Sequence, residues 1–242
     1  MLTNIIIPIY KPTPSPSEIF ALDQSLGVLK NHLHIFIAPH GLNVEFYARR
    51  YNAHFIYFNE LYFSSVLNYS RLLVSTLFYE TFSNADYLLI VQPDVYVFRD
   101  DLPDWLERGI DYVGAPWPSG IELNVQAGKF AKIGGKTTKA FVGNGGFSLR
   151  RREACINLIK EHSEIAEWFV TTGSNEDLFF SLIGSLSENF LIPNQIMASR
   201  FALELNPEHY IDINGGKLPM GVHAFEKHNP EFWLNHMPSW PT

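Results

Sequence analysis

A carboxylate that follows an apolar stretch is the first residue in this sequence that could do chemistry. Asp94 lies three residues beyond the apolar stretch 87–91, in the segment Gln92-Pro93-Asp94. A divalent cation that bridges this carboxylate to a diphosphate would explain its position, because hard cations take carboxylate and phosphate oxygens together. Spacing alone leaves open the alternative that Asp94 caps a turn.

A glycine-rich segment is the second candidate. Residues 141–150 read as an apolar strand interrupted by Gly143, Gly145 and Gly146, with Asn144 among them. Glycine lets another group approach the backbone closely. The Asn144 amide offers both a donor and an acceptor to a sugar hydroxyl. A glycine-containing bulge or hairpin without a ligand is the structural alternative.

An acidic pair, Glu176 and Asp177, opens an expected helix over residues 176–186. Acidic residues are favoured at a helix N-terminus even without a function. Asp177 shares a helix face with Phe180 and Ser181, whereas Glu176 points about 100° away, so only one of the pair can readily serve a common site. A carboxylate in that position is a candidate general base.

Two further polar residues stand in apolar surroundings. Arg71 lies in a stretch over residues 68–82 that reads as one apolar helix, where its charge needs either a structural ion pair or a nucleotide. His223 lies in the late segment 221–225 and suits a neutral metal ligand, although a lone histidine is also a common core residue.

The first half of the chain alternates strands with helices, which positions these residues. Ser15, Pro16 and Glu18 form a capping box that opens a helix after the first strand. The expected strands are residues 5–10, 34–38, 54–58 and 87–91, with helices over 44–51 and 68–82 between them. Nearly continuous apolar strands of this kind predict a doubly wound, mostly parallel α/β sheet covered by helices.

The second half of the chain loses this rhythm. Residues 120–139, rich in Gly and Lys, read as a surface excursion or loop, and a strand over 141–149 follows. Further helices are expected over residues 151–162, 176–186 and 195–203. No segment reads as a linker, so residues 1–242 are expected to form a single domain.

Composition limits the function classes. The 242 residues include 46% hydrophobic and 18% charged residues, which excludes general disorder. A formal charge of -7 argues against nucleic acid as a partner. Cys155 is the only cysteine, and the first eight residues lack the basic region and the longer apolar run of a signal peptide. No run approaches the roughly 18 apolar residues of a membrane span. We therefore expect a cytoplasmic protein.

Taken together, the motifs resemble a known group of enzymes. The strand that ends at Asp94, the segments 112–117 and 143–148, the Glu176-Asp177 pair and the late His223 follow one another in the order seen in an uncharacterised bacterial and fungal family regarded as glycosyltransferases. The chain also resembles, more distantly, the fringe and β-1,3-galactosyltransferase families over residues 5–225. This resemblance implies a GT-A-like (Rossmann-like) fold, with residues 1–98 as a nucleotide-binding half and 99–242 as an acceptor half.

The resemblance also implies roles for single residues. Asp94 matches the last, metal-binding member of an acidic triplet, but Gln92 and Pro93 occupy the other two positions, so the Asp-x-Asp motif is incomplete. His223 matches a late histidine that completes the metal sphere, and Mn²⁺ or Mg²⁺ is the implied cofactor. Asp177, with Glu176 beside it, matches the catalytic base of inverting members.

The same resemblance implies contacts for donor and acceptor. Tyr10, Arg71, Gln92 and Asp94 match the donor-binding region. Trp117, Asn144, Gly145 and Gly146 match positions that border the sugar and the acceptor. The implied partners are a nucleotide-sugar donor, with UDP as the expected nucleotide, and a glycan or lipid-linked saccharide acceptor.

The sequence therefore predicts a glycosyltransferase that inverts the anomeric carbon with Asp177 as base, while retention stays open. Two alternatives remain: a non-catalytic module that binds a nucleotide sugar or glycan, and a metal-dependent phosphohydrolase that uses the same carboxylates. A lipid-linked acceptor would bring the protein to the inner face of the membrane, and aromatic residues near the C-terminus leave peripheral membrane contact open.

Overall fold

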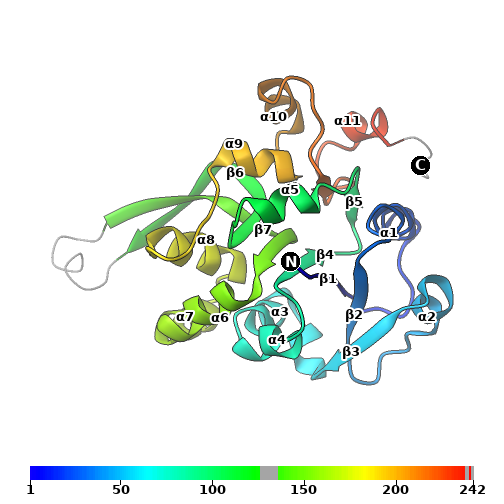
Figure 1. Ribbon diagram of the computed structural model, residues 1–242, viewed down its shortest axis with the longest axis horizontal. Coiled ribbons are helices and arrows are strands. Elements are labelled where there is room, and N and C mark those ends of the chain that lie inside the picture. The colour runs from blue at the N-terminus through cyan, green and yellow to red at the C-terminus, as the bar shows by residue number, and fades with distance from the viewer. Residues whose placement is uncertain (126–135, 238–239, 241–242) are drawn as a thin grey trace.

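A six-stranded sheet forms the centre of the computed structural model, which describes residues 1–125, 136–237 and 240 (Figure 1). Its strand order is β3-β2-β1-β4-β7-β6. The strands are β1 (Thr3–Pro8), β2 (Leu33–Pro39), β3 (His54–Phe58), β4 (Tyr87–Val91), β6 (Tyr112–Val125) and β7 (Lys136–Arg151).

The strand directions confirm the expectation of a mostly parallel sheet. Strands β1 to β4 run parallel to one another, and β7 pairs antiparallel with β4 and with β6. The strand order reverses beside β1, where β2 lies on one side and β4 on the other. In open α/β sheets, ligands bind beyond the carboxyl ends of the strands at such a reversal, so the ends of β1 and β4 mark the expected binding edge.

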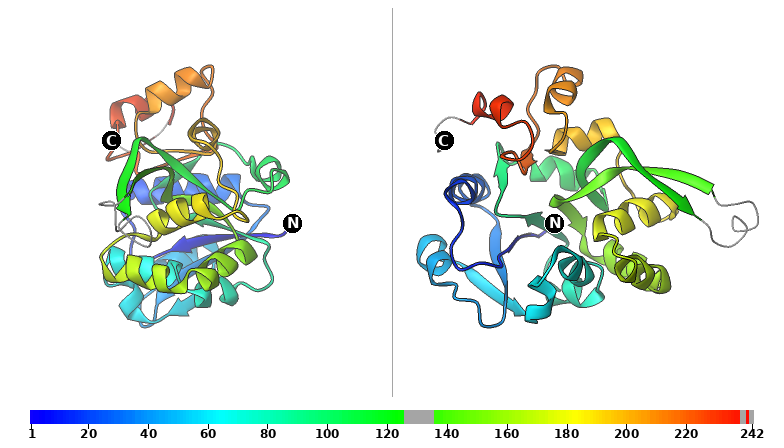
Figure 2. Two further views of the ribbon diagram at one scale, coloured as in Figure 1. Left: turned by 90° about the vertical axis from the view of Figure 1, so that its left-hand side faces the viewer. Right: turned by 180° about the vertical axis from the view of Figure 1, so that it is seen from behind.

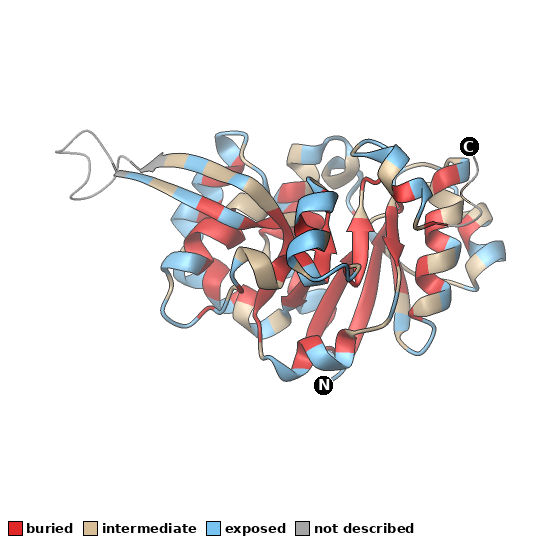
Figure 3. Ribbon diagram, turned by 90° about the horizontal axis from the view of Figure 1, so that it is seen from above, coloured by how far each residue is buried: buried red, intermediate tan, exposed pale blue. Residues whose placement is uncertain are grey.

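Helices cover both faces of the sheet (Figures 1 and 2). One apolar cluster joins the sheet to α1 (Pro16–Val28), α2 (Glu45–Tyr51), α5 (Leu102–Glu107) and α9 (Gln195–Phe201). The other cluster joins it to α3 (Val66–Leu73), α4 (Thr76–Thr81), α6 (Arg152–Glu161), α7 (Ser163–Thr171) and α8 (Glu176–Leu186). Both faces of β1 and β4 are therefore buried, as Figure 3 shows for the middle of the sheet.

A second sheet of three short strands lies beyond the end of β4. Its order is β5 (Val95–Val97), β9 (Gly221–His223) and β8 (Ala202–Leu203). A third apolar cluster packs it against α1, α10 (Pro207–Ile213) and α11 (Pro230–Leu234). Trp233 of α11 is fully buried and Trp240 packs on Phe225, so these late aromatic side chains contribute to a core.

Several local predictions are confirmed, but one expected helix is divided in two. The capping box is present, with the Ser15 side chain accepting from the Glu18 N–H and the Glu18 carboxylate accepting from the Ser15 N–H. The expected helix over residues 68–82 is instead split into α3 and α4. Ser75 causes the break, because its hydroxyl donates to the Leu72 carbonyl and accepts from the Phe78 N–H as the N-cap of α4.

Of the two readings of residues 120–139, the loop was wrong where the segment is described, and the surface excursion agrees with the structure. Residues 120–125 and 136–139 belong to β6 and β7, which form a long two-stranded extension (Figure 1). Cross-strand pairs such as Ile121 with Ala140 explain the strands, because apolar residues alternate with polar ones there. Residues 126–135, the middle of that expected loop, lie outside the described residues.

The last expected helix was too long. The helix expected over residues 195–203 ends at Phe201, and residues 202–203 form β8. Pairing with β9 explains the change, because Leu203 lies opposite Val222 in a parallel ladder. Within the described part of the chain, none of the helices combines the length and the apolar character needed to cross a bilayer.

Candidate functional site

Three polar side chains converge where β4 ends. The Nε2 atom of His223 lies 3.1 Å from Gln92 Oε1 and 3.3 Å from Asp94 Oδ1. The backbone explains this contact, because β5 follows Asp94 directly and pairs antiparallel with β9, so that Val95 lies opposite His223. The side chains of Asp94 and His223 are only 25% and 13% exposed.

Opposite charges stabilise this group. Burial acts to raise the pKa of Asp94, but the hydrogen bond and charge of His223, with a smaller effect of Lys227, keep it below its usual value. Burial acts to lower the pKa of His223, but Asp94 and Glu204 outweigh it and raise the pKa to about 9. Without a bound cation, an imidazolium therefore lies between two carboxylates at neutral pH.

The donor atoms at this point fit a hard divalent cation that is also held by a ligand. Octahedral coordination at about 2.1 Å places neighbouring ligand atoms about 3 Å apart, which is close to the distances from His223 Nε2 to Gln92 Oε1 and to Asp94 Oδ1. No group of three or more His, Cys, Asp or Glu residues in the described ranges could hold a metal by itself. Gln92, Asp94 and His223 could therefore hold a cation only in part, and phosphate oxygens of a ligand would have to complete its coordination.

The glycine segment of β7, residues 143–146, lies directly against the side chains of His223, Glu176 and Trp117. A Cβ atom on Gly146 would lie 2.3 Å from His223 Nε2, and one on Gly145 would lie 2.7 Å from Glu176 Oε1. A Cβ atom on Gly143 would lie 2.6 Å from the Trp117 indole. The β6–β7 register shifts in this region, so the segment combines the bulge and the close approach that the sequence left as alternatives.

The acidic pair at the start of α8 divides into two different environments. Glu176 is 7% exposed and pairs with the fully buried Arg150, whose Nη2 lies 3.1 Å from Glu176 Oε1. The other Glu176 oxygen accepts a 2.7 Å hydrogen bond from the Ser70 hydroxyl. These contacts give Glu176 a structural partner on each oxygen and leave Asp177 as the freer carboxylate.

Asp177 lies beside Gly145, because a Cβ atom added to Gly145 would lie 3.7 Å from the Asp177 Cβ atom. Burial is the main cause that raises the pKa of Asp177 to about 7, and the negative charge of Glu176 adds to it. The N–H of Leu178, 2.8 Å from Asp177 Oδ1, and the charge of Arg150 act in the opposite direction. A carboxylate with a pKa near neutrality suits proton transfer at physiological pH.

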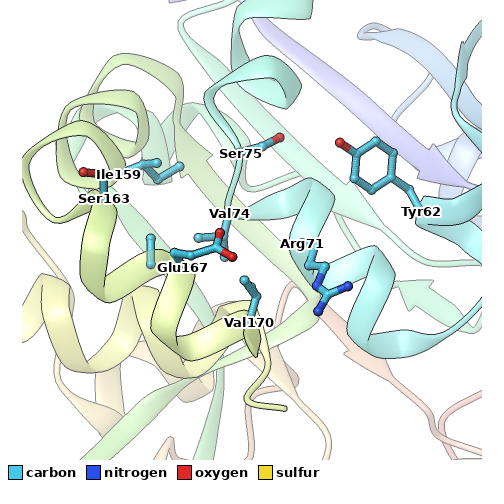
Figure 4. A pocket seen from close by; sticks show the side chains of 9 residues that line it. Tyr62, Arg71, Val74, Ser75, Ile159, Ser163, Glu167 and Val170 are labelled. Carbon is cyan, nitrogen blue, oxygen red and sulfur yellow. The ribbon is translucent and has the colours of Figure 1, made fainter. Parts of the chain in front are cut away.

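Two residues expected at the donor do not join this group. Tyr10, which follows β1 closely, is 59% exposed and contacts Lys11. Arg71 is exposed on α3 and hydrogen-bonds to Asn68. It lines a pocket of about 540 Å³ between α3 and helices α6 and α7, in which Tyr62 and Glu167 also point inward (Figure 4). None of the residues that line this pocket belongs to the group around Asp94 and His223.

Two buried charges near the site were missed by the sequence reasoning. Arg150 lies near the end of the glycine-containing strand, and a charged residue that follows Phe147 and Leu149 in a mostly apolar strand was a signal that could have found it. Glu204 follows β8 and accepts a hydrogen bond from the Asn144 side chain. It was expected near the end of a helix, where its neighbours could not be foreseen.

Comparisons with known proteins identify a sequence family and a fold. Residues 52–223, which include Asp94, Asp177 and His223, match the model of the family described as "Protein of unknown function (DUF5672)". No curated protein matches the chain. Among solved structures, mouse xyloside xylosyltransferase 1 is 11% identical with a TM-score of 0.55, over 93% of this chain and 98% of that chain.

The galactosyltransferase LgtC, solved in complex with donor and acceptor sugar analogs, is a second similar structure. It is 18% identical with a TM-score of 0.50, over 91% of this chain and 86% of that chain. These similarities show that the chain has the GT-A fold, a single mixed α/β domain. Because the sequence identities are low, the similarities show the fold and nothing about the function.

Proposed function

The chain belongs to the family described as protein of unknown function (DUF5672), and we propose that it transfers a glycosyl group from a nucleotide-sugar donor to a hydroxyl of an acceptor. One observation carries this proposal. Gln92, Asp94 and His223 converge at the ligand-binding edge of a GT-A fold, and the adjacent glycine segment also contacts the helix that bears Asp177.

In the proposed reaction, Asp177 accepts the proton of the acceptor hydroxyl as the hydroxyl oxygen forms a bond to the anomeric carbon. The bond between that carbon and the diphosphate oxygen breaks, and the electron pair leaves with the diphosphate. The pKa of Asp177, raised to about 7 by burial and by Glu176, supports its role as base. An attack from the face opposite the diphosphate inverts the anomeric carbon, and the anomer of the product, read by NMR, tests this.

A divalent cation, Mn²⁺ or Mg²⁺, is proposed at Gln92, Asp94 and His223. When bound, it would neutralise charge on the leaving diphosphate. The incomplete acidic triplet leaves the protein with one carboxylate, one imidazole and one amide oxygen for this role. We therefore expect weak binding of the cation alone and tighter binding together with a nucleoside diphosphate.

Other residues are proposed as substrate contacts. The exposed ring of Tyr10 beyond β1 is available to stack on a nucleobase, for which uracil is proposed. The half-buried Trp117, packed over Gly143, offers an apolar face to a sugar, and Asn144 offers polar atoms beside it. A glycan or a lipid-linked saccharide is the proposed acceptor.

Thermal unfolding with nucleotide sugars tests the donor site. UDP-sugars at 100 times their dissociation constant should stabilise the protein by about 2.7 kcal/mol, and only when Mn²⁺ or Mg²⁺ is present. Asp94→Asn should abolish this stabilisation, because it removes the one carboxylate of the cation site. Asp104→Asn, an exposed carboxylate in α5, is the matched control. No stabilisation by any nucleotide sugar would contradict the proposal.

A binding module without turnover is the second candidate, because Gln92 and Pro93 replace two carboxylates of the usual triplet. Asp177→Asn separates the two functions. In a transferase it should lower donor turnover by about 10²–10⁴-fold while binding persists. In a binding module, neither the wild type nor Asp177→Asn turns over the donor. Release of inorganic phosphate without an acceptor would instead identify the phosphohydrolase.

A further inference from the structure

Glu204 occupies a central position behind the proposed cation site. One oxygen, Oε2, accepts a hydrogen bond from Asn144 Nδ2 and lies 3.6 Å from His223 Nδ1. The other, Oε1, lies 3.3 Å from His228 Nε2. The carboxylate is only 13% exposed. A largely buried charge that faces three side chains from different segments is held in a defined orientation.

The small sheet explains why Glu204 lies beside His223. Strands β8 and β9 are parallel, and Leu203 lies opposite Val222. The residues that follow this pair, Glu204 and His223, are therefore neighbours. On the other side of β9, β5 brings Asp94 next to the same histidine. The imidazole therefore lies between two carboxylates, one facing each ring nitrogen.

The two ring nitrogens of His223 have different surroundings. Nε2 faces Gln92 and Asp94. Nδ1 is buried and has no hydrogen-bond partner among the described residues, and the carboxylate that faces it is Glu204. A histidine that binds a cation through Nε2 keeps its proton on Nδ1, and that proton needs an acceptor. A movement of a few tenths of an ångström would bring Glu204 Oε2 within hydrogen-bond distance.

We infer that Glu204 is a positioning residue that accepts the Nδ1 proton of His223 and so directs Nε2 towards Gln92 and Asp94. The inference rests on the cation site of the proposed function. Glu204 does not touch the cation or the donor in this role. It acts through the histidine ring.

The same carboxylate also fixes the glycine segment. Asn144 donates to Glu204 through Nδ2 and accepts from the Gly146 N–H through Oδ1, at 3.2 Å. Gly146 is the residue that lies against the His223 ring. Glu204 therefore holds the ring from behind and, through Asn144, the backbone that lies against the ring.

Direct Mn²⁺ binding, followed by the EPR signal of the free ion, tests the inference without any donor or acceptor. Glu204→Ala should weaken Mn²⁺ binding about 10–100-fold, the usual effect of losing a carboxylate that orients a ligating histidine. Glu204→Gln should recover most of the affinity, because its amide oxygen still accepts from Nδ1. His228→Ala, which removes the partner of Glu204 Oε1 and leaves Oε2 facing Asn144 and His223, should change the affinity less than twofold.

The ¹⁵N signals of the imidazole give a second measurement that a merely structural role would not change. In Mn²⁺-free protein with Zn²⁺ added as a diamagnetic substitute, wild-type His223 should carry its proton on Nδ1 only. In Glu204→Ala this signal should be replaced by a mixture of ring states. Glu204→Gln should resemble the wild type.

The outcomes separate this inference from the proposed function. Wild-type protein that binds Mn²⁺ only as tightly as folded Glu204→Ala overturns the positioning role and leaves the proposed function standing. Glu204→Gln that binds as weakly as Glu204→Ala also overturns it, because charge rather than orientation then matters. Wild-type protein that binds no Mn²⁺ contradicts the cation site, and the inference is overturned with it.

Discussion

Arg150 and Glu176 form a buried ion pair beneath the glycine segment, with 3.1 Å between Arg150 Nη2 and Glu176 Oε1. The guanidinium is fully buried, and its other nitrogens contact the hydroxyls of Tyr79 and Ser148. Because Arg150 belongs to β7 and Glu176 to the first turn of α8, the pair fixes the start of that helix against the sheet. Asp177, the next residue, is positioned as a consequence.

Arg150→Met should destabilise the protein by about 3–5 kcal/mol, because it leaves the Glu176 carboxylate buried without its counter-charge. Urea unfolding, followed by circular dichroism, measures the effect. Lys160→Met is the control, since Lys160 pairs with Glu80 at 3.4 Å on the surface, where both side chains are at least half exposed and such pairs contribute little.

A double variant tests whether the loss comes from the unpaired charge. Arg150→Met combined with Glu176→Gln should be more stable than Arg150→Met alone, because the second change removes the uncompensated carboxylate. A loss of less than about 1 kcal/mol in Arg150→Met would contradict the prediction, because the Glu176 carboxylate would then have found another partner.

Gly146→Ala should weaken Mn²⁺ binding. The added Cβ would lie 2.3 Å from His223 Nε2, so the ring must turn away from Gln92 and Asp94. Isothermal titration with Mn²⁺ measures the change. Gly27→Ala is the matched control, because a Cβ at Gly27, within α1, meets none of the described atoms within 4 Å. It should leave binding unchanged and stabilise the helix by about 0.4–1 kcal/mol. Equal Mn²⁺ affinity in Gly146→Ala and the wild type would show that the ring contact is not rigid.

Asp177 should make the protein less stable as the pH rises from about 4 to about 7. Its carboxyl ionises near 3.8 in the unfolded chain, but burial and Glu176 raise its pKa to about 7 in the folded protein. The folded state therefore binds more protons in this window, and this group lowers the free energy of unfolding by up to about 1.4 kcal/mol per pH unit.

Asp177→Asn isolates this contribution. Urea unfolding at pH 5, 6 and 7 should give a wild-type stability that falls relative to that of Asp177→Asn at each step. If the difference between the two proteins stays constant over this range, the Asp177 carboxyl ionises at its usual pH, and its suitability as a base at neutral pH is lost.

Ser15→Ala should destabilise the protein by about 1 kcal/mol, because it removes the side-chain acceptor at the N-terminus of α1. Thermal unfolding measures the change. Thr13→Ala, an exposed position in the same loop, should lie within about 0.5 kcal/mol of the wild type. If Ser15→Ala and Thr13→Ala lose the same free energy of unfolding, the effect of Ser15 comes from the loop and not from the helix cap.

The parallel half of the fold could be predicted because its signals are local. The capping box of Ser15 and Glu18, and the apolar strands with helices between them, each depend on neighbours in the sequence. Position at strand ends also singled out Asp94, whereas its pairing with His223 was expected only from the family resemblance, and the two side chains do lie side by side. Their roles as metal ligands stay a prediction.

The missed features depend on pairing between distant segments. Strand β8 has two residues and exists because β9 lies beside it, so the position of Glu204 had no local signal. The break between α3 and α4 depends on Ser75, whose hydroxyl bonds to the end of α3 and caps the start of α4. The spacing of apolar residues contains no information about such a side-chain hydrogen bond. Arg150 was detectable as a charge in an apolar strand, and Glu176 was singled out as part of an acidic pair. Nothing local in the sequence indicated that the two side chains form an ion pair.

The late position of His223 has a consequence for a chain that is still being made. Gln92 and His223 are 131 residues apart in the sequence, and a ribosome that adds about 5–20 residues per second needs roughly 7 to 26 s to cover that interval. During this time the parallel strands β1 to β4 have already been synthesised, but His223, Glu204 and β9 have not. A nascent chain can thus begin to fold its sheet well before the three residues proposed to hold a cation have come together.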